Sequence, residues 1–265
     1  MTLHHTTLGT AGGRVVFLHG LFGQGRNWTT IAKSLSGDHR ITLVDLPQHG
    51  RSPWSDHFDY VEVVDQVAAL LADEPAAVVG HSMGGKVAML LALLHPDLVT
   101  RLVVADMSPV RYDGGAGGLG RYARAMLDLD LAAVRTREDA DRLLEPDVPD
   151  TTVRSFLLQN LRRDASAPSG WSWQPNLAVL ERDMPVIADW PEARLAGVPA
   201  YDGPVLWMAG GRSDYVREEY AAAMDRWFPR NRKVVLKQAG HWLHSEQPEL
   251  FTEVLRRFLD AEPSS

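Results

Sequence analysis

Residues 76–85 of the chain read Ala76-Ala77-Val78-Val79-Gly80-His81-Ser82-Met83-Gly84-Gly85. The small and β-branched residues at the start predict a buried strand, and the apolar residues after Gly85 predict a helix. Between them, Gly80-x-Ser82-x-Gly84 predicts a sharp turn, in which glycines permit a strained backbone that lifts a serine hydroxyl above the sheet. Such a pattern alone could be an ordinary tight turn, so the flanking strand and helix carry the interpretation of Ser82 as a nucleophile.

A nucleophilic serine needs a base, because its hydroxyl is a weak nucleophile at neutral pH and is usually activated by an imidazole that a carboxylate orients. His241 lies in Ala239-Gly240-His241-Trp242, directly after the last predicted strand, so a loop can bring it to the edge of the sheet. We predict that His241 is this base. His244 would complete an H-x-x-H metal pair, but that spacing alone is weak, and a packing role is the simpler interpretation.

Two aspartates that follow predicted strands could orient His241. Asp214 lies in Gly210-Gly211-Arg212-Ser213-Asp214, and Asp106 lies in Ala105-Asp106-Met107-Ser108-Pro109. The chain order Ser82, Asp214, His241 favours Asp214. Asp106 could instead cap a turn with its side chain. We therefore predict Asp214 as the acid and keep Asp106 as the alternative.

An oxyanion that develops on the substrate needs preorganised donors, typically the backbone N–H after the nucleophile and one from the loop after an early strand. The first is the N–H of Met83. The second comes from the loop His19-Gly20-Leu21-Phe22-Gly23. We predict that Leu21 supplies it, with Phe22 as the neighbouring alternative.

Outside this motif, short apolar runs alternate with segments of helical period. The predicted strands are residues 15–18, 41–44, 76–79, 102–105, 205–208 and 233–236, with residues 3–8 as a weaker edge strand. The predicted helices are residues 28–35, 60–71, 85–94, 218–227 and 249–259. Continuous apolar strands separated by helices are typical of an α/β fold with a mostly parallel sheet.

The alternation stops after Asp106, and about 95 residues pass before the next predicted strand, far more than an ordinary connection. We predict an α/β core of residues 1–106 and 203–265, with an inserted helical cap of residues 107–202. Within the cap, residues 121–127, 136–144 and 152–161 are predicted helices. Its tryptophans could line an acyl pocket or fill the cap's own core; they are Trp171, Trp173 and Trp190.

The glycine-rich stretch 115–120 spells G-x-G-x-x-G, the pattern of a dinucleotide-binding turn. That motif must follow its strand immediately, whereas the preceding strand is predicted to end at Ala105. We therefore predict a hinge here and expect no cofactor. Asp45 and His49 could suggest a metal pair, but no third ligand lies nearby in sequence, so we expect a structural turn and no metal.

Composition excludes several classes of protein. The sequence has 27 Lys and Arg against 34 Asp and Glu, a net charge of −7, which is the wrong sign for binding a phosphate backbone. With no cysteine, disulfide scaffolds and thiolate chemistry are excluded. The longest apolar run, residues 87–94, is far shorter than the about 20 residues of a membrane span, and residues 1–13 show no export signal. We expect a cytoplasmic protein that is a monomer or homodimer and binds no nucleic acid.

Four segments together resemble the α/β-hydrolase superfamily: the loop 19–23, the turn 45–52, the elbow 80–85 and Ala239-Gly240-His241-Trp242. The combination of H-G-L-F-G, G-H-S-M-G-G-K and D-x-S-P is further similar to a branch of small bacterial esterases and thioesterases. This resemblance implies a Ser-His-Asp triad that cleaves small acyl esters or thioesters through an acyl-enzyme. Some members of the branch use an acid after the cap-bearing strand, which keeps Asp106 open.

Other functions remain compatible with the same residues. The triad could serve a carbon–carbon bond hydrolase or a cofactor-free lyase, and the scaffold could be a small-molecule receptor with little turnover. Arginines near the start of the cap could meet an anionic group such as a coenzyme A phosphate; they are Arg111, Arg121 and Arg124.

Overall fold

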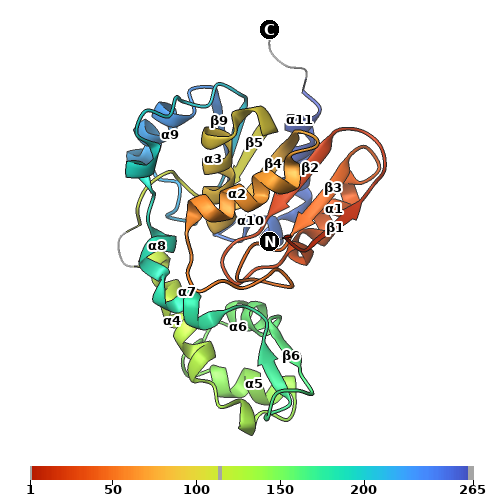
Figure 1. The fold of residues 1–265 in the computed structure, drawn as a ribbon, viewed down its shortest axis with the longest axis vertical. Helices are drawn as coiled ribbons and strands as arrows, with labels where there is room; N and C mark the ends of the chain where they lie inside the picture. Colours follow the sequence, from red (N-terminus) through yellow and green to blue (C-terminus); the bar gives the residue numbers. More distant parts are fainter. Residues whose placement is uncertain (1, 113–114, 262–265) are drawn as a thin grey trace.

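The computed structural model describes residues 2–112 and 115–261, and within them a seven-stranded sheet forms the centre of the molecule (Figure 1). The strand order is β1-β3-β2-β4-β5-β8-β9. The bounds are β1 (His5–Leu8), β2 (Arg14–Leu18), β3 (Arg40–Val44), β4 (Ala76–His81), β5 (Val99–Ala105), β8 (Val205–Gly210) and β9 (Asn231–Leu236). β1 pairs antiparallel with β3, and the other pairs are parallel. The predicted α/β fold is confirmed, including the edge strand.

Helices cover both faces of this sheet, because alternate side chains of each strand point to opposite faces. In β2, Val16 and Leu18 pack in the cluster that includes α2 and α3, whereas Val15 and Phe17 pack in the cluster that includes α1 and α11. The helices of the core are α1 (Thr29–Leu35), α2 (Tyr60–Leu71), α3 (Met83–Leu94), α9 (Ala221–Trp227), α10 (Leu243–Glu246) and α11 (Pro248–Leu259). The nearly all-apolar α3 is buried along almost its whole length, as expected for a helix without a polar face.

Between β5 and β8 the chain leaves the sheet and forms a separate lobe, which occupies the lower part of Figure 1. We call residues 107–202 the cap. Its elements are α4 (Gly115–Asp128), α5 (Arg137–Leu144), α6 (Thr151–Leu158), β6 (Leu161–Arg163), β7 (Trp171–Trp173), α7 (Leu177–Arg182) and α8 (Met184–Ala188).

Two local predictions for the cap are corrected. Residues 115–120 are not a hinge but the first turns of α4. The helix predicted over 152–161 ends at Leu158, and Leu161 instead begins β6, which pairs antiparallel with β7. Strands of three residues are too short to show a period of two, so the sequence carried no signal for this hairpin.

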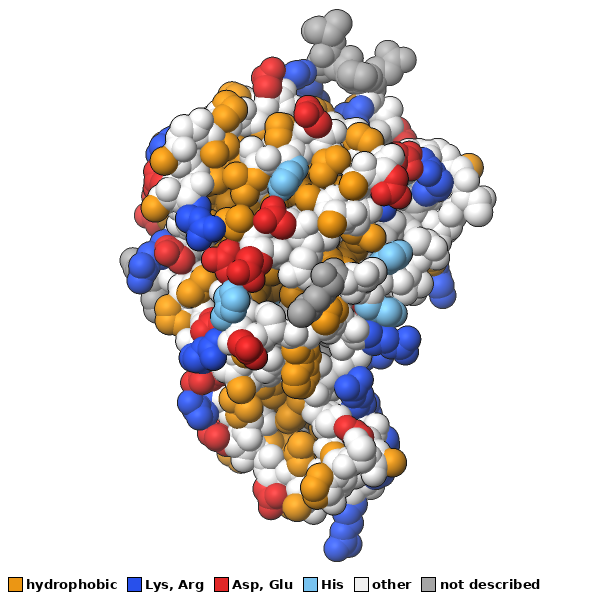
Figure 2. All heavy atoms as spheres, viewed as in Figure 1, with side chains coloured by type: hydrophobic (Ala, Val, Ile, Leu, Met, Phe, Trp, Pro, Cys, Tyr) orange, Lys and Arg blue, Asp and Glu red, His pale blue; other side chains and the backbone are white. Residues whose placement is uncertain are grey.

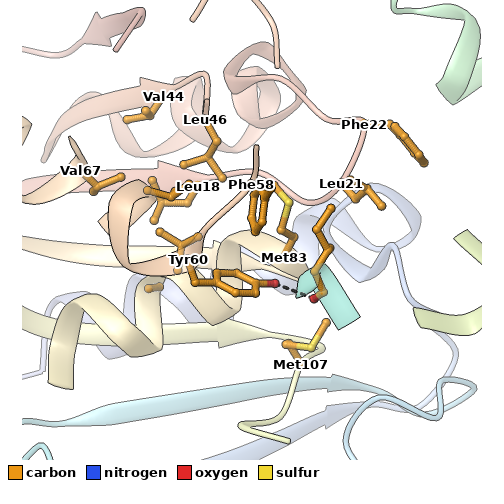
Figure 3. Packing of buried hydrophobic residues seen from close by; sticks show 14 of the residues in the cluster. Leu18, Leu21, Phe22, Val44, Leu46, Phe58, Tyr60, Val67, Met83 and Met107 are labelled. Carbon is orange, nitrogen blue, oxygen red and sulfur yellow. Dashed lines mark hydrogen bonds between the residues drawn. The ribbon is translucent and has the colours of Figure 1, made fainter. Parts of the chain in front are cut away.

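The cap is held on the core partly by buried polar contacts. Lys86 of α3 donates to three backbone carbonyls at the end of α8, those of Ile187, Ala188 and Asp189, at 3.4, 2.7 and 2.6 Å. Tyr60 of α2 donates to the Ile187 carbonyl at 2.8 Å. Figure 3 shows this hydrogen bond as a dashed line from the Tyr60 hydroxyl, in the region between Met83 and Met107. Burial lowers the pKa of Lys86 to about 7.

The visible surface carries no large field of one sign. Acidic and basic side chains are interspersed over both core and cap on the face shown in Figure 2. Among the helices that the structure describes, none is both long and apolar enough to cross a bilayer.

Candidate active site

Ser82 sits on a strained turn at the carboxyl end of β4, immediately before α3. Its backbone has φ 53° and ψ −120°, a conformation that non-glycine residues rarely adopt. Hydrogen bonds hold the turn: the Ser82 N–H donates to the Ala105 carbonyl, and Gly85 N–H donates to the Ser82 carbonyl. A Cβ atom on Gly80 would lie 2.2 Å from the Gly84 carbonyl oxygen, so this turn requires glycine there.

His241 joins Ser82 to a buried carboxylate. Its Nε2 lies 3.0 Å from Ser82 Oγ, and its Nδ1 lies 2.8 Å from Asp106 Oδ2. Asp106 accepts hydrogen bonds only, so a neutral imidazole donates from Nδ1 and presents the Nε2 lone pair to the serine hydroxyl. This is the arrangement that lets the imidazole take the serine proton.

Asp106 is fully buried, and other donors fix its carboxylate. Oδ1 accepts from the Gly210 N–H at 2.9 Å, and Oδ2 also accepts from the Ser213 hydroxyl. The Asp106 N–H donates to the Met208 carbonyl at 2.8 Å. The carboxylate is therefore held between β5 and β8 by hydrogen bonds from both sides.

Asp214, the acid expected from chain order, does not reach His241, which corrects that expectation. Its side chain is 88% exposed and lies 3.8 Å from Arg217. The reason is the strand order: β5 lies between β4 and β8, so a residue directly after β5 stands beside the serine that follows β4. The loop after β8 instead directs Ser213 at Asp106 and leaves Asp214 in solvent.

Two aromatic rings position the imidazole of His241. The Tyr215 ring stacks on it, with centroids 4.1 Å apart and planes 25° apart. His81 Nε2 donates to the His241 backbone carbonyl at 2.8 Å. Burial lowers the pKa of His81 well below its ordinary value, so this ring stays neutral beside the site.

The loop after β2 packs against the elbow and offers one free donor. A Cβ atom on Gly20 would lie 3.1 Å from the Ser82 Cβ. Among the described residues, no hydrogen bond uses the N–H of Leu21 or Met83. The Phe22 N–H, the alternative donor, is not available, because it donates to His49 Nε2 at 3.1 Å. Burial lowers the pKa of His49 to about 3, which keeps it a neutral acceptor.

Two adjoining cavities lie near Ser82, and they differ in size and in the polarity of their walls. A small cavity of about 30 Å³ lies against Ser82 and is walled mainly by apolar side chains, including Leu21, Tyr122, Val153 and Leu157. A second cavity of about 910 Å³ adjoins it between α6 and α10, with polar walls that include Thr151, Thr152, Ser155 and Ser245. Phe156 and Trp242 border both.

The predicted pocket tryptophans do not line either cavity. Trp171 is buried in the cap, where its Nε1 donates to the Val134 carbonyl at 2.9 Å. Trp173 and Trp190 pack on the same hydrophobic cluster. Several aromatic residues that line the small cavity were missed from sequence, although Trp242 had a signal in its place beside His241; they are Trp28, Tyr122, Phe156 and Trp242.

None of the three cap arginines is among the residues that line these two cavities. Arg124 pairs with Glu181 at 2.6 Å, Arg121 lies over the Tyr122 ring, and Arg111 approaches Asp189 at 4.0 Å. They are therefore not arranged as a phosphate site.

The turn containing Asp45 and His49 has structural contacts. Asp45 accepts from the N–H groups of Gly25 and Arg51 at 2.7 and 2.9 Å. His244 packs its ring on Trp28, with centroids 4.5 Å apart. Across residues 2–112 and 115–261, no three His, Asp or Glu side chains are grouped as a metal ion would require.

Comparison with known proteins extends over both sheet and cap. A family model described as alpha/beta hydrolase fold matches residues 13–248. The Mus musculus protein named sn-1-specific diacylglycerol lipase ABHD11 is 37% identical over 254 residues, which cover 92% of this chain and 80% of that protein. Esterase YbfF of Escherichia coli (strain K12) is 32% identical over 253 residues, 93% of this chain and 92% of the esterase. A solved structure described as a marine microorganism esterase has a TM-score of 0.91 at 30% identity, covering 97% of this chain and 99% of its own.

Proposed function

The chain belongs to the α/β-hydrolase fold family, and from that premise we propose that it is a serine hydrolase that cleaves carboxylic esters. The observation that carries the proposal is the hydrogen-bonded series Ser82, His241, Asp106 at the carboxyl edge of the sheet. Two of its relatives are named a diacylglycerol lipase and an esterase, and both names support cleavage of an ester bond.

In the proposed reaction, Ser82 Oγ attacks the ester carbonyl carbon while His241 Nε2 takes the hydroxyl proton. The N–H groups of Met83 and Leu21 donate to the oxyanion of the tetrahedral intermediate. His241 then gives its proton to the departing alcohol, which leaves an acyl group on Ser82. Water, activated by the same Nε2, releases the acyl group, and Asp106 stabilises the imidazolium in both steps. A thioester is cleaved by the same steps with a thiol as leaving group.

The two cavities favour a substrate with a small acyl group and a larger polar alcohol. The adjoining cavity measures about 910 Å³, whereas the space against Ser82 measures about 30 Å³. An acyl chain of a few carbons fits such a space better than a long one. The adjoining cavity of about 910 Å³ offers hydroxyls of Thr151, Ser155 and Ser245 to a polar leaving group.

The test is hydrolysis of p-nitrophenyl esters from acetate to dodecanoate by the wild type and by Ser82→Ala. We expect the wild type to hydrolyse the short esters with the highest kcat/KM, and Ser82→Ala to lower kcat by about 10⁵ to 10⁶. Activity that survives in Ser82→Ala would rule out this serine as nucleophile. Folded wild type that hydrolyses no ester would instead favour a carbon–carbon bond hydrolase, a lyase or a receptor.

A further inference from the structure

The cap reaches into the core at the loop that carries the oxyanion donor. Asn160, in the turn between α6 and β6, donates from Nδ2 to the Phe22 carbonyl at 2.8 Å. Its Oδ1 accepts from Gln24 Nε2 at 2.7 Å. Asn160 is 1% exposed and Gln24 is 4% exposed, so water does not compete for these bonds. A cap residue thus contacts Phe22 and Gln24, which follow Leu21 and lie more than 130 positions before Asn160 in the sequence.

Phe22 needs such support because its backbone is strained. Its φ is 59°, in the left-handed region that non-glycine residues rarely occupy. A conformation of this kind persists only where the surroundings fix it. The core fixes the N–H of Phe22 through His49, and the cap fixes its carbonyl through Asn160.

We propose that Asn160 is a positioning residue for the oxyanion hole, so that the hole is complete only when the cap is seated on the core. The proposal rests on the proposed function. Leu21 directly precedes Phe22, so holding the N–H and the carbonyl of Phe22 fixes the C-terminal side of Leu21 and restricts how far the Leu21 N–H can turn. Asn160 therefore acts through Phe22 on the donor and need not touch the substrate.

A matched control exists at another contact between cap and core. Asn176 of the cap donates from Nδ2 to Gln48 Oε1 at 3.0 Å, so it contacts the turn 45–52 and makes no hydrogen bond to Phe22 or Gln24. The substitution Asn176→Ala removes the same amide group from the same lobe. A general loosening of the cap would affect both variants, whereas a role at the oxyanion hole affects only Asn160→Ala.

The test measures kinetics and affinity for a trifluoromethyl ketone, whose adduct with Ser82 places an oxyanion in the hole. We expect Asn160→Ala to lower kcat on p-nitrophenyl acetate by about 10²-fold, with KM changed less than about twofold. The Ki for the ketone should rise by a similar factor. Asn176→Ala should leave kcat and Ki within about twofold of the wild type.

A second variant covers the case in which Asn160→Ala does not fold. Gln24→Leu removes the support of Asn160 from the core side, and we expect a smaller loss of kcat and of ketone affinity in the same direction. Unchanged kcat and Ki in the folded variants, or equal losses in Asn176→Ala, would overturn the proposal. Labelling of wild-type Ser82 by a fluorophosphonate tests the proposed function by itself. If the wild type is neither labelled nor active, the proposed function is wrong, and the inference about Asn160 fails with it. If the wild type is labelled and active, the Asn160 variants test the inference alone.

Discussion

Three residues of the site hold their backbones at positive φ although none is glycine. They are Phe22 at 59°, Ser82 at 53° and Asp106 at 51°. Each such conformation raises the free energy of the folded chain by about 1–3 kcal/mol. Each is fixed by hydrogen bonds of its own peptide groups, such as Asp106 N–H to the Met208 carbonyl. Ser82 and Asp106 directly follow β4 and β5, and Phe22 lies in the loop after β2, so the strained residues lie in the loops that form the proposed site.

The identity of the acid is testable at single residues. We expect Asp106→Asn to lower kcat by about 10⁴, because an amide can present a donor to His241 Nδ1 and so favour the wrong tautomer. Asp214→Asn should stay within about twofold of the wild type, since its side chain is 88% exposed. Steady-state kinetics on one short ester measures both. A large loss in Asp214→Asn with little change in Asp106→Asn would reverse the assignment.

At the scale of elements, the packing of α3 on the end of β2 sets the distance between Ser82 and the proposed oxyanion loop. A Cβ atom on Gly84, in the first turn of α3, would lie 2.4 Å from the His19 carbonyl oxygen and 2.6 Å from that of Leu18. Helix and strand end are thus in backbone contact. This contact also explains why the pattern around Ser82 needs its second glycine.

Gly84→Ala tests this contact. The added methyl group forces α3 away from β2, and we expect a loss of stability of about 1–3 kcal/mol, as in other overpacked sites. The activity should also fall, because Ser82 moves relative to the oxyanion loop. Thermal unfolding and kcat are the measurements. Gly37→Ala, where an added Cβ meets nothing within 4 Å, is the control and should leave both unchanged.

At the scale of the whole molecule, core and cap share buried polar groups as well as apolar surface. Lys86 and Tyr60 reach from the core to the end of α8, and Asn160 reaches from the cap to the oxyanion loop. Because an unpaired buried donor or acceptor is costly, these bonds favour one seating of the cap over others. Buried neutral histidines of the core, such as His49, are part of the same network.

The buried His49 makes the free energy of unfolding depend on pH. Burial lowers the pKa of His49 to about 3, whereas the unfolded imidazole titrates near about 6.5. The unfolded state therefore binds more protons between these values, and the free energy of unfolding decreases as the pH falls, by up to about 1.4 kcal/mol per pH unit.

Urea unfolding of the wild type and of His49→Gln at pH 7.0, 6.0 and 5.0 checks this dependence. The glutamine amide can still accept from the Phe22 N–H but does not titrate. We expect the stability difference between the two proteins to be largest above pH 6.5 and to shrink as the pH falls. A constant difference would show that His49 is not the group that titrates.

Most elements of the core could be predicted because their signals are local. Buried parallel strands such as β2 and β8 are continuous apolar runs, and α2 has a capping aspartate, Asp59, that accepts from the N–H groups of Val61 and Glu62. The hairpin of β6 and β7 could not be predicted from the sequence, because strands of three residues are too short to show an alternation of apolar and polar residues. Its pairing also depends on the cap around it. The small cavity likewise depends on Phe156 and Trp242, which meet only when α6 packs on the core.

For the site, local sequence was sufficient to select Ser82 and His241, because an elbow and a post-strand loop are made by neighbouring residues. The proposed acid could be chosen only from the tertiary structure. Asp106 and Asp214 both follow strands, and the order β4-β5-β8 in the sheet, which the chain order does not state, places Asp106 beside Ser82. The anchoring of Phe22 by Asn160 also has no local signal. Hydrogen bonds within a turn depend on adjacent residues, whereas contacts across strands and between lobes depend on how the whole chain packs.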